Sequence, residues 1–191
     1  MMNYSLILGS QSSRRQQLME ELGFSFTTRV ISTEELFPSS LGVDQIAEYL
    51  AVEKGKAHLP SMHPHELVVT ADTTVVLNQQ VLNKPKDLPD AIHMLQQLSG
   101  CAHQVITGVC LTTLDGQQSF SDRTKVYFTK LMEGEIDYYV KKFRPLDKAG
   151  GYAIQEWIGM IGINRIEGSY YNVVGLPVEK LYQALKDYNL K

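Results

Sequence analysis

The sequence predicts an α/β fold, with a mixed twisted sheet flanked by helices. Over the first 100 residues, short apolar runs alternate with longer segments whose apolar residues recur at helical spacing. Two long strand patterns then follow each other across Asp115-Gly116, the clearest hairpin signal in the chain. Strands and helices that alternate until a hairpin interrupts them are typical of a mixed sheet with helices on both faces. Folds of this kind place their active cleft at the strand ends.

The expected elements begin with a strand–turn–helix unit. Residues 4–8 are a short apolar run, typical of a buried strand. Residues 16–22 place two leucines and a methionine on one helical face before Gly23 ends the helix. Ser12 or Ser13 is the expected N-cap. A second strand is predicted over residues 24–31.

Apolar periodicity and turn residues predict the remaining elements. They are a helix over 43–59 that Asp44 can cap, a strand over 67–77 that returns over 81–87, a helix over 88–98 closed by Ser99-Gly100, strands over 104–114 and 117–130, a helix over 132–143, a short strand after the paired glycines 150 and 151, and a helix over 179–188. Residues 159–171 contain several glycines and give no clear assignment.

The composition is that of an ordinary soluble globular protein, with 43% hydrophobic and 20% charged residues among 191. The formal charge of −3 provides no basic field that would favour nucleic acid. Cys101 and Cys110 cannot form a disulfide framework or a closed zinc site, and both are predicted to be buried thiols. No apolar stretch approaches the roughly 20 residues that span a bilayer, so we expect a cytoplasmic protein without membrane contact.

The stretch over residues 6–15 has the pattern of an anion-binding turn. An apolar strand ends at a glycine, passes through three serines and enters a helix, where backbone N–H groups and the helix dipole attract an anion. Arg14 and Arg15 stand in the first helical turn, where cations are disfavoured by the dipole but can grip a phosphate. The alternative is an ordinary capped helix with a solvated arginine pair.

Asp72 stands in the middle of a run of β-branched and apolar residues. A carboxylate buried there without a partner costs several kcal/mol, so a cation, backbone donors or a metal must compensate its charge. We therefore favour a functional carboxylate. The alternative is a strand break at Asp72 that opens the side chain to solvent.

Three other charged positions have both an ordinary and a functional interpretation. Lys54 lies near the C-terminus of its expected helix, where a cation suits the dipole. Glu34-Glu35 follow a strand and are read as a solvated loop, although they could form half of a metal site. Lys84 precedes Pro85, and the restricted backbone there suits a positioned charge.

Six segments of the chain match the motifs of one known family, in the order in which the family has them. They are Leu8-Gly9-Ser10-Gln11-Ser12-Ser13-Arg14-Arg15, Ala71-Asp72-Thr73, Lys84-Pro85-Lys86-Asp87, Leu98-Ser99-Gly100-Cys101-Ala102-His103, the segment from Asp147 to Gln155 and the segment from Gly168 to Pro177. Through these segments the chain resembles the Maf family of septum-formation-inhibitor-like proteins. The resemblance implies that residues 1–191 form a single Maf-like domain, two-lobed with a central cleft and similar to inosine triphosphate pyrophosphatases.

The same resemblance implies a house-cleaning nucleoside triphosphate pyrophosphatase, which cleaves between the α and β phosphates with Mg or Mn. Within the family, Ala-Asp-Thr marks the members that prefer dTTP and UTP, and modified pyrimidine triphosphates are further candidate substrates. By position, the implied roles are triphosphate binding by Ser10, Arg14 and Arg15, additional charge around the phosphates from Lys54 and Lys84, metal binding by Glu35 and Asp72, proton abstraction from water by Asp72, and base selectivity from Arg14, Thr73 and Gln155.

The chain departs from the family's pattern at three places. Ser13 replaces a proline that would preset the first helical turn, and Gly9 replaces an alanine, which loosens the same turn. Glu156-Trp157 follow Gln155 where many members have glycine. This last departure bears on fine substrate preference rather than on the chemistry.

Two alternative functions stay open at this point. The first is a regulatory binding protein that senses nucleotide and acts in septum formation and cell division. The second is the same hydrolysis on another triphosphate, such as 7-methyl-GTP, although that branch carries Ser-Asp-Gln in place of Ala-Asp-Thr. A homodimer would fit the prevalence of two-fold dimers among soluble enzymes.

Overall fold

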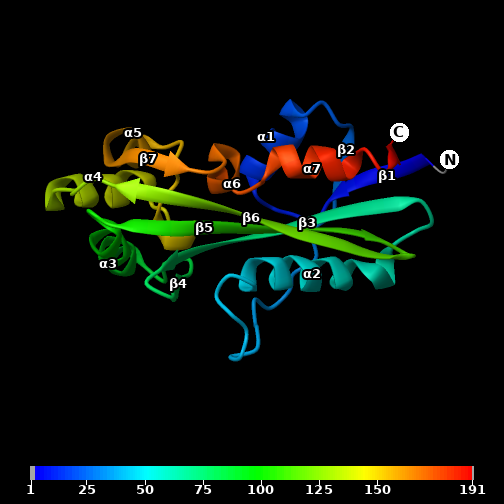
Figure 1. Cartoon of the computed structure of the whole chain (residues 1–191), viewed down its shortest axis with the longest axis horizontal. Coiled ribbons are helices and arrows are strands. Elements are labelled where there is room, and N and C mark those ends of the chain that lie inside the picture. Colours follow the sequence, from blue (N-terminus) through cyan, green and yellow to red (C-terminus); the bar gives the residue numbers. More distant parts are fainter. Residues whose placement is uncertain (1–2, 191) are drawn as a thin grey trace. The chain divides into compact units, whose positions relative to one another are not determined.

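The computed structural model describes residues 3–190, and within this range eight strands form one mixed sheet that carries helices (Figure 1). The strands are β1 (Asn3–Leu8), β2 (Phe26–Thr28), β3 (Glu66–Leu77), β4 (Gln80–Leu82), β5 (Ala102–Thr113), β6 (Gly116–Phe128), β7 (Ile163–Glu167) and β8 (Asn189–Leu190). The helices are α1 (Ser13–Glu21), α2 (Ile46–His58), α3 (Leu88–Leu98), α4 (Glu133–Phe143), α5 (Trp157–Gly162), α6 (Tyr170–Val174) and α7 (Val178–Leu185), with 3-10 turns η1 (Leu59–Ser61) and η2 (Ala149–Gly151). The strand order is β2-β1-β3-β5-β6-β7, with β4 beside β3 and β8 beside β1. The predicted α/β class with a mixed sheet flanked by helices is confirmed.

The described residues divide into two compact units. Unit 1 contains the residues up to Asp72, Thr107–Asp122 and the residues from Gly175 onward. Unit 2 contains Thr73–Ile106 and Arg123–Val174. The long strands β3, β5 and β6 contribute residues to both units, and the boundary in β3 falls between Asp72 and Thr73. The interpretation of the chain as a single domain stays a prediction.

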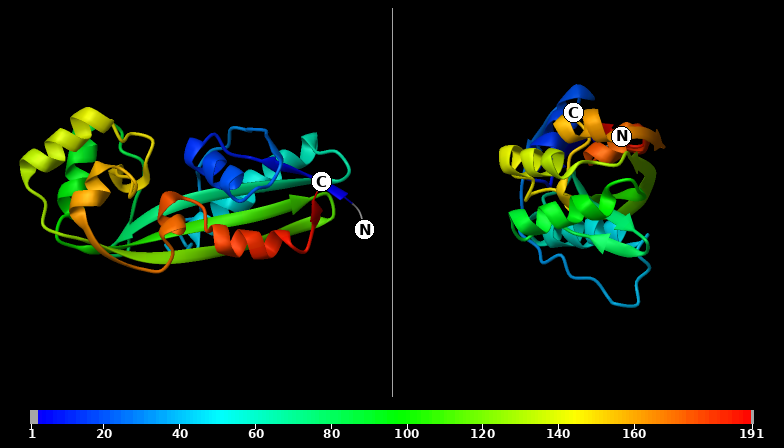
Figure 2. Two further views of the ribbon diagram at one scale, coloured as in Figure 1. Left: turned by 90° about the horizontal axis from the view of Figure 1, so that it is seen from above. Right: turned by 90° about the vertical axis from the view of Figure 1, so that its left-hand side faces the viewer.

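The core of unit 1 is built on parallel strands. β1 pairs in parallel with β2, β3 and β8, and its register with β3 places Leu6, Ile7 and Leu8 opposite Leu67, Val68 and Val69. All six side chains are at most 4% exposed. Parallel strands that are covered on both faces read as continuous apolar runs, as here. Figure 1 shows α1 and α7 on one side of these strands and α2 on the other, and Figure 2 shows β8 beside β1.

Two glycines allow α2 to lie close against the sheet. A Cβ atom on Gly108 of β5 would stand 2.3 Å from the backbone of Glu48, and a Cβ atom on Gly55 of α2 would stand 2.4 Å from Oγ1 of Thr112. Neither position has room for a methyl group. The close approach fixes α2, and with it Lys54, against the strands of unit 1.

Unit 2 has its own hydrophobic core, in which α3 and α4 pack against each other. α3 buries Ala91, Met94, Leu95 and Leu98 along one face, and its bounds are those that the apolar periodicity predicts. α4 buries Ile136, Tyr139 and Val140 along one face. The side chain of Asp87 caps α3 by accepting a hydrogen bond from the N–H of Asp90.

Several predicted elements differ from those observed. The strand predicted over residues 24–31 is shortened to β2, and the cap predicted for Asp44 is wrong, because Gln45 occupies the N-cap position of α2 without a side-chain hydrogen bond. The short strand predicted after the paired glycines is also wrong, since residues 152–155 form coil and turn. Residues 159–171, which gave no assignment, contain the end of α5, all of β7 and the start of α6.

The two cysteines differ in burial. Cys110 is fully buried and confirms its prediction, whereas Cys101 is half-buried. Burial raises the pKa of the Cys110 thiol, which keeps it protonated. Among residues 3–190, no helix has both the length and the apolar character needed to cross a membrane.

Candidate active site

The opening turn adopts the predicted capped arrangement. β1 ends at Leu8, α1 begins at Ser13, and Oγ of Ser12 accepts a hydrogen bond from the N–H of Arg15 at 3.4 Å. Ser10 is 8% exposed, and its Oγ accepts from the N–H of Ser12 at 3.3 Å. Both serines therefore hold the turn at the N-terminus of α1, where an anion is stabilised.

Arg15 ties this turn to two distant parts of unit 1. Its Nε donates to the carbonyl oxygen of Gly175 at 2.8 Å, and its Nη1 donates to that of Ala71 at 3.0 Å and lies 3.3 Å from Oγ of Ser10. The sequence pattern suggested a phosphate ligand and gave no sign of these partners. The observed contacts show that Arg15 also has a structural role, because it links α1 to the residue before Asp72.

The arginine pair carries an electrostatic cost that an anion would offset. Burial lowers the pKa of Arg15, and the neighbouring guanidinium of Arg14 lowers it further, while the carboxylates of Asp72 and Glu35 oppose the shift. Arginine stays protonated in proteins, so the two adjacent positive charges repel each other in the fold. A bound phosphate would convert this repulsion into two charge-assisted contacts.

Asp72 lies in an unbroken strand and is 7% exposed, so the alternative of a strand break is wrong. Its Oδ1 accepts from Nζ of Lys54 at 2.5 Å. Burial raises the pKa of Asp72, and the ammonium group of Lys54 is the largest opposing influence. The charge in the middle of the strand is therefore compensated by a cation, as its position required.

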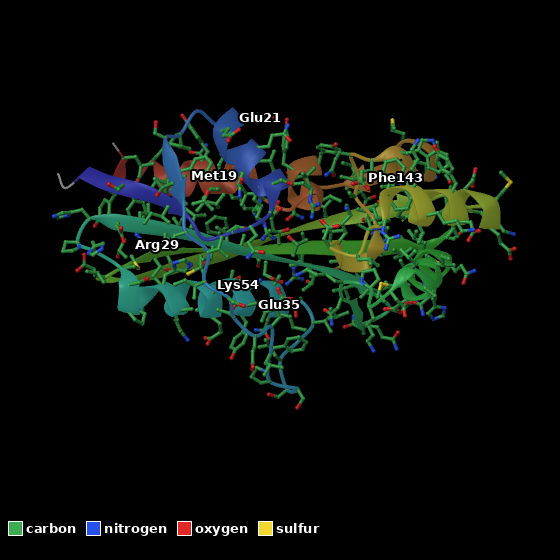
Figure 3. The ribbon with its side chains drawn as sticks, turned by 180° about the vertical axis from the view of Figure 1, so that it is seen from behind. Met19, Glu21, Arg29, Glu35, Lys54 and Phe143 are labelled. Carbon is green, nitrogen blue, oxygen red and sulfur yellow. The ribbon has the colours of Figure 1, made fainter. Side chains whose placement is uncertain are left out.

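Glu35 joins the same group. Nζ of Lys54 donates to Oε1 of Glu35 at 3.0 Å as well as to Asp72, and Figure 3 shows the side chains of Lys54 and Glu35 next to each other. The basic residues in the last turn of α2 are Lys56 and His58, so the interpretation of Lys54 as a cation that stabilises the end of the helix is wrong. Glu35 is half-exposed in a loop, as the ordinary interpretation predicted, yet it is held in an ion pair.

Glu35 and Asp72 are the residues that could supply oxygen ligands to a divalent cation, at a point that Nζ of Lys54 occupies. Because both contact one ammonium nitrogen, their oxygens converge on a single point between α2 and β3. Carboxylate oxygens are the ligands that Mg and Mn prefer, and Mg is usually held by one or two of them together with substrate phosphates. In the described range no group of three or more His, Cys, Asp or Glu side chains could hold a metal, so such an ion would depend on the substrate for its other ligands.

The other predicted site residues belong to unit 2. Thr73 follows Asp72 directly in β3, and Lys84 is exposed between β4 and α3. Gln155 is exposed in the turn before α5 and lines a hollow of about 440 Å³ whose walls include Ile163, Ile166 and other residues of α5 and β7. The structure thus gathers Ser10, Arg14, Arg15, Glu35, Lys54 and Asp72 in unit 1.

The sequence reasoning missed a group of buried polar side chains within unit 2. Nε2 of His103 lies 2.7 Å from the hydroxyl of Tyr152, so two of the sequence motifs meet in the interior of unit 2. Burial lowers the pKa of His103 to about 4, which keeps its ring neutral at pH 7. Lys148 is also buried, between the carboxylates of Asp147 and Glu156. A signal existed, because His103 and Lys148 stand inside two of the family motifs, although neither residue had an assigned role.

The fold and the opening turn define an α/β protein that presents a serine-capped helix N-terminus, the kind of turn that favours anions, at the carboxyl end of a parallel strand. The comparison with family models makes the assignment specific: the model described as "Maf-like protein" matches residues 5–188, and the chain belongs to this family.

Curated relatives match almost the full chain. A protein of Phocaeicola vulgatus is 50% identical over 184 residues, which cover 96% of this chain and 95% of the relative. A protein of Bacteroides thetaiotaomicron is 49% identical with the same coverage, and one of Porphyromonas gingivalis is 45% identical over 188 residues, or 97% and 94% of the two chains. All three relatives are named dTTP/UTP pyrophosphatase. A crystal structure of a dITP/XTP pyrophosphatase from Mycobacterium abscessus aligns with 95% of this chain and 93% of that chain, at 15% identity and a TM-score of 0.45.

Proposed function

We propose that this protein hydrolyses dTTP and UTP between the α and β phosphates, giving the nucleoside monophosphate and pyrophosphate. The observation that carries the proposal is the buried Asp72 carboxylate, paired with Lys54 and adjacent in the chain to the carbonyl that Arg15 binds. The names of relatives that are 45–50% identical over nearly the full chain support this activity and its substrates.

Asp72 acts in this proposal as the base that accepts a proton from the attacking water. Burial raises its pKa, and a carboxylate with a raised pKa is a stronger base near neutral pH. Lys54 holds Oδ1 and thereby fixes the orientation of the carboxylate before substrate binds. A fixed base contributes roughly 10²- to 10⁴-fold to the rate.

The departing pyrophosphate needs its negative charge neutralised. The turn at Ser10, the guanidiniums of Arg14 and Arg15 and the ammonium groups of Lys54 and Lys84 would supply the positive potential, and preorganised charges of this kind carry much of the rate in phosphoryl transfer. Glu35 and Asp72 would hold Mg or Mn. When bound, the cation would neutralise phosphate charge and polarise the phosphoryl oxygens.

Gln155 and Thr73 would select the base. A glutamine amide presents one carbonyl acceptor and one NH₂ donor, which match the N–H and C=O groups of the imide edge that thymine and uracil share. Cytosine lacks this edge, because an amino group replaces one carbonyl and its ring nitrogen carries no proton. The cytoplasmic location, the homodimer and the lack of a nucleic-acid partner stay predictions.

The experiment that tests the proposal measures pyrophosphate release from a panel of nucleoside triphosphates with Mg, with Mn or with a chelator. We expect metal-dependent release from dTTP and UTP, a loss of at least 100-fold in Asp72→Asn with nucleotide binding retained, and no change in Asp137→Asn, which alters an exposed carboxylate. Release from other triphosphates alone would refute the roles of Thr73 and Gln155. No release from any triphosphate would refute the activity and favour a nucleotide-binding protein.

A further inference from the structure

The turn that presents Gln155 is closed by its own backbone. The N–H of Glu156 donates to the carbonyl oxygen of Ala153 at 3.1 Å, so Gln155 occupies the third position of a tight turn over residues 153–156. Ala153 and Ile154 are 6% and 8% exposed, whereas Gln155 points away from the core and is exposed. The side chain at this position points outward from the turn. Its direction therefore depends on the contacts that hold the two ends of the turn.

One buried hydroxyl group holds both ends. The hydroxyl of Tyr139, on α4, accepts a hydrogen bond from the N–H of Ala153 at 3.2 Å and donates to Oε2 of Glu156 at 2.5 Å. The ring of Tyr139 is fully buried and stacks on Phe143 with centroids 5.0 Å apart. Burial, and next the carboxylate of Glu156, raise the pKa of Tyr139, so the phenol keeps the proton that it donates.

Glu156 is held from its other side as well. Its Oε1 lies 3.4 Å from Nζ of Lys148, and this buried ammonium group also contacts Oδ1 of Asp147 at 2.7 Å. Removing one member of such a network leaves buried polar groups without partners, which costs more than the lost hydrogen bond alone. The network therefore favours one position of the turn strongly over others.

We propose that Tyr139, together with Glu156, is a positioning residue that fixes Gln155 and thereby sets the discrimination between nucleobases. The inference rests on the proposed function, because it takes Gln155 to contact the base. Tyr139 itself touches neither the phosphates nor the base.

The test compares kcat/KM for UTP with kcat/KM for CTP in five proteins: the wild type, Tyr139→Phe, Glu156→Gln, Gln155→Ala and Tyr138→Phe. Tyr138→Phe is the matched control, because it removes a hydroxyl group from the same helix. The hydroxyl of Tyr138 accepts a hydrogen bond from Nζ of Lys142 and does not contact the turn. We expect Tyr139→Phe and Glu156→Gln to lower the preference for UTP by about tenfold, mainly through a higher KM for UTP. Tyr138→Phe should keep the preference of the wild type.

A double variant separates positioning from general stabilisation. If Tyr139 acts through Gln155, Tyr139→Phe should lower the preference no further once Gln155 is alanine, because the two residues form one unit. Additive losses, or a lower melting temperature with an unchanged preference, would overturn the inference. If Tyr139→Phe does not fold, Glu156→Gln decides in the same way. A Gln155→Ala variant with the preference of the wild type would instead refute the base role of Gln155, and with it the premise of the inference.

Discussion

A methyl group at Gly108 would test whether the close packing of α2 positions Lys54 against Asp72. A Cβ atom at this position would lie 2.3 Å from both N and Cα of Glu48 and 2.4 Å from the carbonyl carbon of Ala47. These are backbone atoms of a helix, so no side chain can rotate away to make room. Ordinary van der Waals contact begins at 3.4 Å, and α2 must therefore move outward by about 1 Å.

The size of the effect follows from this displacement. Overpacking a well-filled core costs about 1–3 kcal/mol, and the rigid neighbours place Gly108→Ala at about 2–3 kcal/mol. For a chain of this length the melting temperature should fall by roughly 4–12 °C. Lys54 lies on the same helix, 2.5 Å from Oδ1 of Asp72, and a misplacement of about 1 Å lowers kcat/KM by roughly 10- to 100-fold.

Thermal unfolding and pyrophosphate release from UTP measure the two effects. The matched control is Gly134→Ala, because a Cβ atom on Gly134 in the first turn of α4 has nothing within 4 Å. Alanine there should be neutral or stabilise the protein by up to about 1 kcal/mol, with unchanged activity. If the melting temperature of Gly108→Ala equals that of the wild type, α2 does not depend on this contact and the reasoning is refuted.

Three further substitutions test other contacts. Lysine in Arg15→Lys cannot reproduce the two guanidinium donors that reach the carbonyl oxygens of Gly175 and Ala71. The substitution should lower the free energy of unfolding in urea by about 2 kcal/mol and raise the KM for UTP. An unchanged urea midpoint would contradict the structural role of Arg15. Gly9→Ala would place a methyl group 2.8 Å from Nε2 of the buried His58, so it should destabilise the protein by about 1–2 kcal/mol. In a double-mutant cycle, adding His58→Ala should recover part of this loss. His103 has a pKa of about 4 in the fold against 6.5 when unfolded, so the unfolded chain binds the extra proton and stability should fall by about 3 kcal/mol as the pH drops from 6.5 to 4. In His103→Gln that fall should be smaller in urea titrations at several pH values, whereas an equal pH dependence would show that other groups cause it.

Elements with a strong local pattern could be predicted from the sequence, and those that distant contacts hold in place could not. The bounds of α3 agree with the prediction because its four buried apolar side chains recur at helical spacing and Asp87 caps its start. The β5–β6 hairpin follows from Asp115-Gly116 for a similarly local reason. The turn at residues 152–155 has no such pattern, since contacts with α4 hold it. Asp44 fails as a cap because α2 begins two residues after it, at a position set by packing on the sheet.

The residues of the candidate site also fall into two classes: those that a local sequence signal indicated and those that no local signal indicated. The turn at Ser10 and the special character of Asp72 were visible because a capping serine and a buried carboxylate leave local signals in the sequence. The meeting of Glu35 with Lys54 left none, because a loop and a helix 19 residues apart converge only in the folded chain, and Glu35 was singled out through the resemblance alone. Tyr139 lies in a helix that the sequence predicts, yet nothing in an apolar helical pattern indicates that its hydroxyl holds a turn 14 residues further along.

The order of synthesis gives the bond between Arg15 and Gly175 a further consequence. These two residues are 160 positions apart, and β8 joins β1 through the pairing of Leu190 with Tyr4. Residues of the opening turn leave the ribosome long before Gly175 does, whereas the segments of unit 2 are complete by residue 174. The opening turn therefore gains its last anchor only after every segment of unit 2 has been synthesised. A chain cut before Gly175 would lack that anchor, so its opening turn should be less firmly held than it is here.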